Sequence, residues 1–390
     1  MINMLKQVAV VTVMSLRTVP QRIGSSLVVV IGMACAVGAL VSILSMSAGF
    51  LRTMAATGSP LRAIVLSDGA LGEWGSNLAH GEAAIIADLP GVQKDADGKP
   101  VVSAEYIGYT VVPKKSDGLD AYLTVRGVSA ANSKLRPEIR LVSGRMFRPG
   151  QYEVIVGASA QAQFDGLKQG DKVSMPEGDW LVTGTFASNG SGSESELITD
   201  STTLLSAMRT AAYNSMTVRL ETAGAFAGFK NALTARPGPA LEISRESDYY
   251  ADQSKSFDHF LTTVAFVVGG IMGLGATFGA LNTMYSVVST RSREIATLRA
   301  IGFGGGAVVM SVMTEALLFC LIGAMLGILF AWAVFNGYQH AMGGLVIRLA
   351  VTTKLALVGM TFALLLGAIG GLFPAIRAAR LPITDALRAT

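Results

Sequence analysis

Four apolar runs, separated by polar stretches of very unequal length, restrict the fold of this 390-residue chain more than any other feature. The first run, 27–50, stands alone near the N-terminus, and about two hundred mostly polar residues follow it. The runs 260–288, 307–335 and 355–373 come after that polar stretch. A hydrocarbon layer about 30 Å thick requires roughly 20 helical residues to cross it. The pattern therefore predicts a helical membrane protein with four transmembrane helices.

The composition and charge agree with a membrane location. The chain is 51% hydrophobic and 15% charged, whereas soluble proteins carry about 25% charged residues. Its net charge is +4, and the basic surplus lies in short segments beside the apolar runs. The sequence has no arginine and aromatic platform of the kind that binds a nucleic-acid groove. We therefore expect membrane lipid, and no nucleic acid, among its partners.

The distribution of positive charge predicts the orientation in the membrane. Basic residues flank the first, second and fourth runs: Lys6, Arg17 and Arg22; Arg291, Arg293 and Arg299; Arg377, Arg380 and Arg388. Positive charge in short loops marks the cytoplasmic side, whereas long domains cross the membrane largely regardless of charge. Both termini are therefore expected in the cytoplasm, and the long polar domain outside it.

These assignments divide the chain into consecutive segments. Their expected bounds are a cytoplasmic or interfacial N-terminal segment (1–24), transmembrane helix 1 (25–50), an extracytoplasmic domain (51–257), transmembrane helix 2 (258–288), a cytoplasmic loop (289–306), transmembrane helix 3 (307–335), a short extracytoplasmic loop (336–354), transmembrane helix 4 (355–374) and a cytoplasmic tail (375–390). The first run is longer than the 7–15 apolar residues of a signal peptide, so we expect it to remain as a transmembrane helix. Residues 247–259 contain no proline or glycine, so the second helix is expected to extend out of the membrane.

The inserted domain is predicted to be mixed α/β. Period-two alternation and β-branched residues favour strands at 101–112, 121–128, 153–156, 180–186, 216–220 and 241–244, and helices are expected at 82–89, 159–167 and 223–235. The polar, glycine-rich stretch 188–196 is predicted to be a mobile loop. Both cysteines, Cys35 and Cys320, fall in predicted transmembrane helices, so no disulfide is expected to stabilise this domain.

Small residues recur at four-residue spacing in the apolar runs. The pairs are Gly269/Gly273, Gly275/Gly279, Gly323/Gly327 and Gly367/Gly371. Such pairs let membrane helices approach closely. The contacts could lie within one subunit or between two subunits, and the sequence favours neither.

Residues 289–303, between the second and third runs, are predicted to form a short amphipathic helix. Ile295, Leu298 and Ile301 are expected along one face, and Gly302 ends the helix. Charged residues complete the segment: Arg291, Arg293, Glu294 and Arg299. A rigid helix between two transmembrane helices is suited to bind another protein and pass force to the membrane. From the residues alone, an ordinary positively charged cytoplasmic loop explains the segment more simply.

This segment closely resembles the signature of FtsX-like ABC transporter permeases, R-x-R-E-I-x-x-L-R-A-[IL]-G, which the sequence from Arg291 to Gly302 matches at every specified position. Further similar stretches are Glu315-Ala316-Leu317, similar to E-A-L-L, and Phe373 to Leu381, similar to Y-P-A-x-x-A-A-R-L. The inserted domain resembles the MacB-like periplasmic domain more weakly, at Leu89-Pro90-Gly91-Val92, Gly144-Arg145-Met146-Phe147 and 167–173.

The resemblance implies a type VII permease subunit, which works by mechanotransmission. In that family a separate ABC ATPase, which binds ATP and Mg²⁺, moves the cytoplasmic coupling helix, and the motion reaches the periplasmic domain. Carried over to this chain, the coupling residues are Arg291, Arg293, Glu294, Ile295, Leu298, Arg299 and Gly302. The implied partners are the ATPase and a second permease copy or paralogue, with a periplasmic adaptor and an outer-membrane channel in many relatives. The implied location is the bacterial inner membrane.

Export or efflux is the activity that this resemblance favours, and two other functions stay open. The protein could release lipoproteins from the membrane, or it could relay a signal that regulates a cell-wall hydrolase without transporting anything. The sequence contains no G-x-x-x-x-G-K-[ST] motif, so we expect no ATPase activity and no bound cofactor on these residues. The three histidines lack the spacing of zinc ligands, and no metal site is predicted.

Glu315 is the one ionisable residue of the apolar runs that needs an explanation of its own. It lies near the cytoplasmic end of the third run, because residues 316–335 alone are long enough to cross the bilayer. We expect it to pair with an arginine of the cytoplasmic loop, such as Arg299. A proton-coupling role is the weaker alternative, because no second acidic residue or histidine lies within an apolar run.

Overall fold

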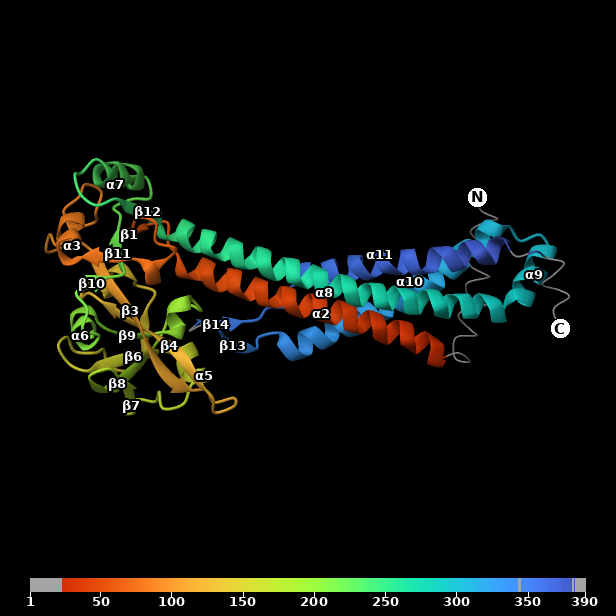
Figure 1. Ribbon diagram of the computed structural model, residues 1–390, viewed down its shortest axis with the longest axis horizontal. Coiled ribbons are helices and arrows are strands. Elements are labelled where there is room, and N and C mark those ends of the chain that lie inside the picture. The colour runs from red at the N-terminus through yellow and green to blue at the C-terminus, as the bar shows by residue number, and fades with distance from the viewer. Residues whose placement is uncertain (1–22, 343–344, 381, 383–390) are drawn as a thin grey trace. The chain divides into compact units, whose positions relative to one another are not determined.

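The computed structural model describes residues 23–342, 345–380 and 382 (Figure 1). Most of the predicted N-terminal segment and the end of the C-terminal tail lie outside the described residues. The chain divides into two compact units. The first comprises Met1–Ala48, His259–Tyr338 and Leu349–Thr390, and the second comprises Gly49–Asp258 and Gln339–Arg348.

The first unit is helical and contains the four predicted apolar helices. Among the described residues, four helices are long and apolar enough to cross a membrane: α2 (Ile23–Thr57), α8 (Glu246–Thr290), α10 (Gly305–Phe335) and α11 (Thr353–Arg380). Helix α8 begins twelve or more residues before its apolar run, as the absence of proline and glycine predicted. Helices α2 and α8 each contribute residues to both units.

Glycines bring the helices of the first unit into backbone contact. A Cβ added to Gly327 would lie 2.4 Å from the carbonyl oxygen of Ala34, and one added to Gly323 would lie 2.6 Å from that of Val30, so α10 packs closely on α2. Gly367 and Gly371 of α11 are similarly close to side chains of α10. These two pairs therefore serve contacts within the chain. No atom lies within 4 Å of a Cβ built at Gly275, so its place in a contact between subunits stays a prediction.

The second unit is built on one ten-stranded sheet, with strand order β12-β1-β11-β3-β4-β9-β6-β8-β5 and β7 paired to β8. Its strands are β1 (Arg62–Ser67), β3 (Val102–Pro113), β4 (Asp120–Val128), β5 (Arg140–Gly144), β6 (Glu153–Gly157), β7 (Lys172–Met175), β8 (Gly178–Ala187), β9 (Leu197–Asp200), β11 (Ser215–Arg219) and β12 (Leu241–Arg245), and a separate two-stranded sheet pairs β2 (Leu78–Ala79) with β10 (Ala212–Tyr213). Its helices are α3 (His80–Ala87), α4 (Asn132–Leu135), α5 (Ala158–Gln163), α6 (Ser201–Ala207) and α7 (Ala225–Thr234), with the 3-10 turns η2 (Glu73–Gly75) and η3 (Gly192–Ser195).

Two large hydrophobic cores cover this sheet, and a smaller cluster contains Ile155 and Phe186. One surrounds Trp180 and Phe164 and includes residues of β4, β6, β8, α5 and α6. The other surrounds Phe229 and Ile86 and joins α3 and α7 to β1 and β11. All six predicted strands and all three predicted helices are confirmed, with ends that differ by a few residues. Four strands of this sheet were not predicted from the sequence, β1, β5, β7 and β9, and each is only four to six residues long.

The prediction that residues 188–196 form a mobile loop is wrong. The Glu194 carboxylate accepts hydrogen bonds from the backbone N–H groups of Ser188 and Gly190, and Ser195 is fully buried. The burial of Ser195 comes from the segment predicted as the 336–354 loop, which contains a hairpin of β13 (Gln339–Met342) and β14 (Leu345–Arg348). The Val346 N–H donates to the Ser195 hydroxyl over 2.8 Å. The polar turn is therefore buried under a hairpin that is distant in sequence.

Candidate functional site

The predicted coupling segment forms a short helix, α9 (Ser292–Ala300), between α8 and α10. Arg291 is its N-cap residue, and Glu294 lies in its first turn, where the helix dipole favours a negative charge. At the other end, the Phe303 N–H bonds to the Leu298 carbonyl and the Gly302 N–H to the Arg299 carbonyl, which together form a Schellman motif. Gly302 has φ +102°, a conformation that favours glycine. The sequence prediction of a helix that stops at Gly302 is confirmed.

One face of α9 packs against the ends of helices α10 and α11. Ile295 and Ala296 are buried, and Ile295 packs with Val308 and Val312 of α10 and with Ala375 of α11. The prediction that Ile295 and Ile301 lie on one apolar face is wrong, because Ile295 is buried against other helices of the chain whereas Ile301 is 69% exposed. Each of these positions comes three residues after the one before it. At 3.6 residues per turn, each such step falls about 60° short of a full turn, so the Ile301 side chain points about 120° away from that of Ile295.

The outward face of α9 is mixed in character. Arg293, Glu294, Thr297 and Ile301 are exposed, and Leu298 and Arg299 are partly exposed. A short rigid helix that presents two opposite charges and an isoleucine offers both charge pairing and apolar contact to another protein. Of the seven residues assigned by resemblance, Arg293 and Glu294 are thus available to a partner, and Gly302 shapes the helix end.

Arg291 forms ion pairs that its position in the motif did not predict. Its side chain is largely buried, and its Nε lies 3.0 Å from a Glu294 carboxylate oxygen. Its Nη1 lies 3.7 Å from a carboxylate oxygen of Glu315 of α10, whose side chain is 2% exposed. The structure therefore gives Glu315 an arginine of the cytoplasmic loop, as predicted, but the residue in that position is Arg291. This ion pair joins the start of α9 to α10.

A chain of buried ion pairs occupies the second unit and was not found from the sequence. It alternates five glutamates with three arginines: Glu73, Glu196, Arg126, Glu105, Arg136, Glu246, Arg62 and Glu138. Burial opposes the charge of Glu105, yet the neighbouring Arg136 and Arg126 outweigh it and hold the Glu105 pKa below its usual value. Of these residues, Glu105 and Arg126 stand at buried positions of β3 and β4, and a charge within a predicted strand was the sequence signal that could have found them.

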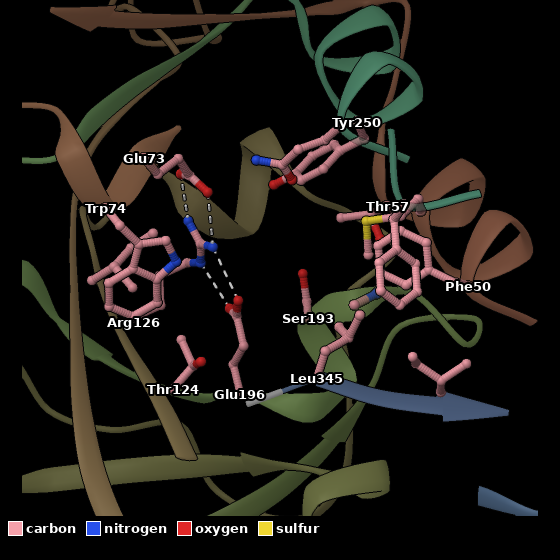
Figure 2. Close-up of a pocket in the computed structure, with 16 residues that line it drawn as sticks. Phe50, Thr57, Glu73, Trp74, Thr124, Arg126, Ser193, Glu196, Tyr250 and Leu345 are labelled. Atoms are coloured by element: carbon pink, nitrogen blue, oxygen red, sulfur yellow. Dashed lines mark hydrogen bonds and ion pairs between the residues drawn. The ribbon is translucent and has the colours of Figure 1, made fainter. Parts of the chain in front are cut away.

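A cavity of about 240 Å³ lies beside one end of this chain of ion pairs (Figure 2). Its lining includes Glu73, Trp74, Thr124, Arg126, Glu196 and Tyr250, together with Phe50, Met54, Phe257 and Leu345. Figure 2 shows Arg126 held between Glu73 and Glu196, with Trp74 beside it. The cavity therefore has a charged, aromatic end and an apolar end. Among the described residues, no group of three or more potential metal ligands is present.

Two family models match the chain. Residues 266–383, which contain α9, match the FtsX-like permease C-terminal domain. Residues 26–236 match the MacB-like periplasmic core domain, and this match alone spans more than half of the chain. The chain belongs to the MacB/FtsX-like family of ABC transporter permeases. Together with the four apolar helices, membership in this family makes it a multi-pass membrane protein with a periplasmic-type α/β domain.

Several named proteins are similar to this permease. The macrolide export ATP-binding/permease protein MacB of Bartonella henselae is 30% identical over 155 residues, which is 40% of this chain and 23% of that protein. The uncharacterized ABC transporter permease YknZ of Bacillus subtilis is 29% identical over 133 residues, 33% of this chain and 32% of that protein. The matched part thus spans a third or less of these curated relatives. A solved structure is also similar, the crystal structure of the periplasmic region of MacB from Actinobacillus actinomycetemcomitans. The alignment covers 53% of this chain and 96% of the chain in that structure, with 14% sequence identity and a TM-score of 0.37.

Proposed function

We propose that this chain is the transmembrane subunit of an ABC transporter in which α9 receives force from an ATPase subunit on a separate polypeptide. ATP and Mg²⁺ bind to that ATPase, and hydrolysis there drives movement of the extracytoplasmic α/β unit. Two copies of the chain, or one copy and a paralogue, act with the ATPase in the bacterial inner membrane. Export or efflux with a periplasmic adaptor and an outer-membrane channel is the activity we assign to the complex.

The outward face of α9 is the observation that carries this proposal. The helix is short, its end is closed by the Schellman motif at Gly302, and Arg291 ties its start to Glu315. Force applied to Arg293, Glu294 or Ile301 therefore acts on a helix that is joined to α10 by an ion pair and packed against α11. A flexible loop would bend under the same force and transmit less of it. Family membership supplies the kind of partner, since ABC permeases act with ATPases.

Purification with the candidate ATPase tests the proposal directly. The double variant Arg293→Ala/Ile301→Asp changes two exposed residues and no buried one, so the fold should be retained. We expect it to lose most of the bound ATPase, or to abolish the stimulation of ATP hydrolysis in lipid nanodiscs. Lys354→Ala, at an exposed basic residue beyond α10, is the control and should behave as the parent chain. Equal ATPase recovery and equal hydrolysis rates in all three proteins would overturn the proposed role of α9.

A further inference from the structure

The cavity between β4, η2, η3 and the start of α8 has the chemistry of a binding site, and the coupling role of α9 does not use it. Every lining residue belongs to the second unit. Its volume is about 240 Å³. That space suits a small organic group and not a folded partner.

The charged end of the cavity cannot attract an anion. Arg126 is the only basic residue among the described residues that line it. All five of its N–H donors are already directed at carboxylates: Nε and Nη2 to Glu196, Nη1 and Nη2 to Glu73, and Nη1 also to Glu105. No donor of this guanidinium remains for a ligand in the cavity.

The same end has spare capacity to accept hydrogen bonds from a cation. Glu73 and Glu196 share the single guanidinium of Arg126, which also pairs with Glu105. A carboxylate has about four lone-pair sites, and Glu196 accepts two described hydrogen bonds, both from Arg126. The connected ion pairs contain five carboxylates and three guanidinium groups, an excess of two negative charges. Unbalanced charge with little access to water is unfavourable, so a bound cation would stabilise this end.

Tyr250 adds a second hydrogen-bonding group to the cavity. Its side chain lines the cavity and is 8% exposed (Figure 2). Within the part of the chain that the structure describes, its hydroxyl group makes no hydrogen bond and is not one of the fully buried polar atoms without a partner, so it is open to the space of the cavity. Burial raises the Tyr250 pKa, so the hydroxyl keeps its proton and can also accept a hydrogen bond. A donor group within the cavity would find the Tyr250 hydroxyl oxygen available as an acceptor.

Aromatic and apolar side chains complete the cavity. The Trp74 ring stacks on Tyr109 with a centroid separation of 3.8 Å, which fixes an electron-rich ring beside the carboxylates. Such rings attract organic cations. At the other end, Phe50 and Phe257 pack against each other with centroids 4.5 Å apart, and Met54 and Leu345 extend the apolar wall. A ligand that fits both ends carries a positive charge on a short hydrocarbon chain.

We propose that this cavity binds a small amphipathic organic cation, an alkylammonium ion whose head lies by Glu196 and Tyr250 and whose chain lies by Phe50 and Phe257. This goes beyond the proposed coupling function, because the binding needs neither an ATPase nor α9. A failure of one proposal therefore leaves the other standing.

Binding of hexylammonium to the full chain in lipid nanodiscs tests this inference by isothermal titration calorimetry. Empty nanodiscs of the same lipid correct for partition into the bilayer. Two probes of the same length, 1-hexanol and hexanoate, separate charge from hydrophobic size. We expect saturable binding of hexylammonium, binding of hexanol at least about tenfold weaker because a charge-assisted hydrogen bond is lost, and no binding of hexanoate. Equal binding of the alcohol, or no saturable binding of hexylammonium up to about 1 mM, would overturn the inference.

Two variants locate the site. Glu196→Gln keeps an acceptor for Arg126 and removes the charge, and it should weaken hexylammonium binding about tenfold. Tyr250→Phe removes one hydroxyl that has no described partner, so it should fold normally and bind severalfold more weakly. Glu177→Gln makes the same change at an exposed carboxylate outside the cavity and should bind as the parent chain. Unchanged affinity in Tyr250→Phe would contradict the proposed site even if Glu196→Gln failed to fold.

Discussion

Arg291 and Glu315 lie on different helices, and the Arg291 Nη1 stands 3.7 Å from the Glu315 carboxylate in a nearly water-free position. The first residue caps α9 and the second belongs to α10, so the contact joins the proposed ATPase-binding helix to a transmembrane helix. Burial of both groups makes the pair consequential, because removing one partner of a buried ion pair is destabilising.

The first prediction concerns this pair. Glu315→Gln should lower the unfolding free energy by about 3 kcal/mol, because it removes the negative charge from a buried ion pair that joins Arg291 to α10. The loss should appear as a lower melting temperature in nanodiscs and as weaker stimulation of the ATPase. Glu294→Gln, at an exposed partner of the same arginine, should cost less than about 1 kcal/mol. A Glu315→Gln protein with the melting temperature and ATPase response of the parent would remove the structural role of the pair.

The end of α9 supplies a second prediction with a matched control. Gly302 has φ +102° and open space around its Cβ position, so Gly302→Ala introduces backbone strain alone. The cost should be about 1–2 kcal/mol, seen as a lower melting temperature. Gly304→Ala also meets open space but lies at φ −69°, where alanine is unstrained, and its melting temperature should not fall. Equal effects at the two positions would show that the helix end does not depend on the left-handed conformation.

Close packing of α10 on α2 leads to a third prediction. Gly327→Ala places a Cβ 2.4 Å from the Ala34 carbonyl oxygen, so the two helices must separate. We expect destabilisation of about 1–3 kcal/mol from the overpacked contact, measured by unfolding in mixed micelles. Gly275→Ala adds the same methyl group where no atom lies within 4 Å, and it should leave monomer stability unchanged. A neutral Gly327→Ala would contradict the helix contact described here.

The buried ion pairs predict how the α/β unit responds to acid. Arg136 and Arg126 hold the folded-state pKa of Glu105 below its ordinary value of 4.5, despite the opposing effect of burial. The stability that this depressed pKa contributes is present above pH 4.5 and is lost as the pH falls through the folded-state pKa. The fluorescence of buried Trp180 should therefore report a falling melting temperature below pH 4.5. Glu105→Gln should be less stable at pH 7 and should flatten this dependence, and an unchanged slope would exclude Glu105 as its origin.

Sidedness is the fifth prediction. In a variant without native cysteines, Thr297→Cys on exposed α9 should resist a membrane-impermeant maleimide in intact spheroplasts and react after lysis. Leu119→Cys, 65% exposed in the α/β unit, should react before lysis. Labelling of Thr297→Cys from outside would contradict the proposed orientation and the role of α9 together.

Local pattern was sufficient for much of this protein. Runs of apolar residues long enough to cross a bilayer specified the four helices, because their backbone groups must be satisfied within each segment. Alternation specified strands such as 121–128, and Gly302 marked the end of α9, because each signal acts over a few neighbouring residues. The motif that begins at Arg291 was also sufficient to indicate the family.

Contacts between residues distant in the sequence required the tertiary structure. The pairing of Glu315 with Arg291 depends on how α9 turns at the end of α8, which no local pattern specifies. The burial of Ser195 depends on a hairpin that begins about 140 residues later, at Gln339. Thus the sequence by itself determined which segments are helices and strands, since hydrophobic period and length are local properties. Only the tertiary structure decided which charges are neutralised and where a cavity remains, since burial is a property of the packed chain.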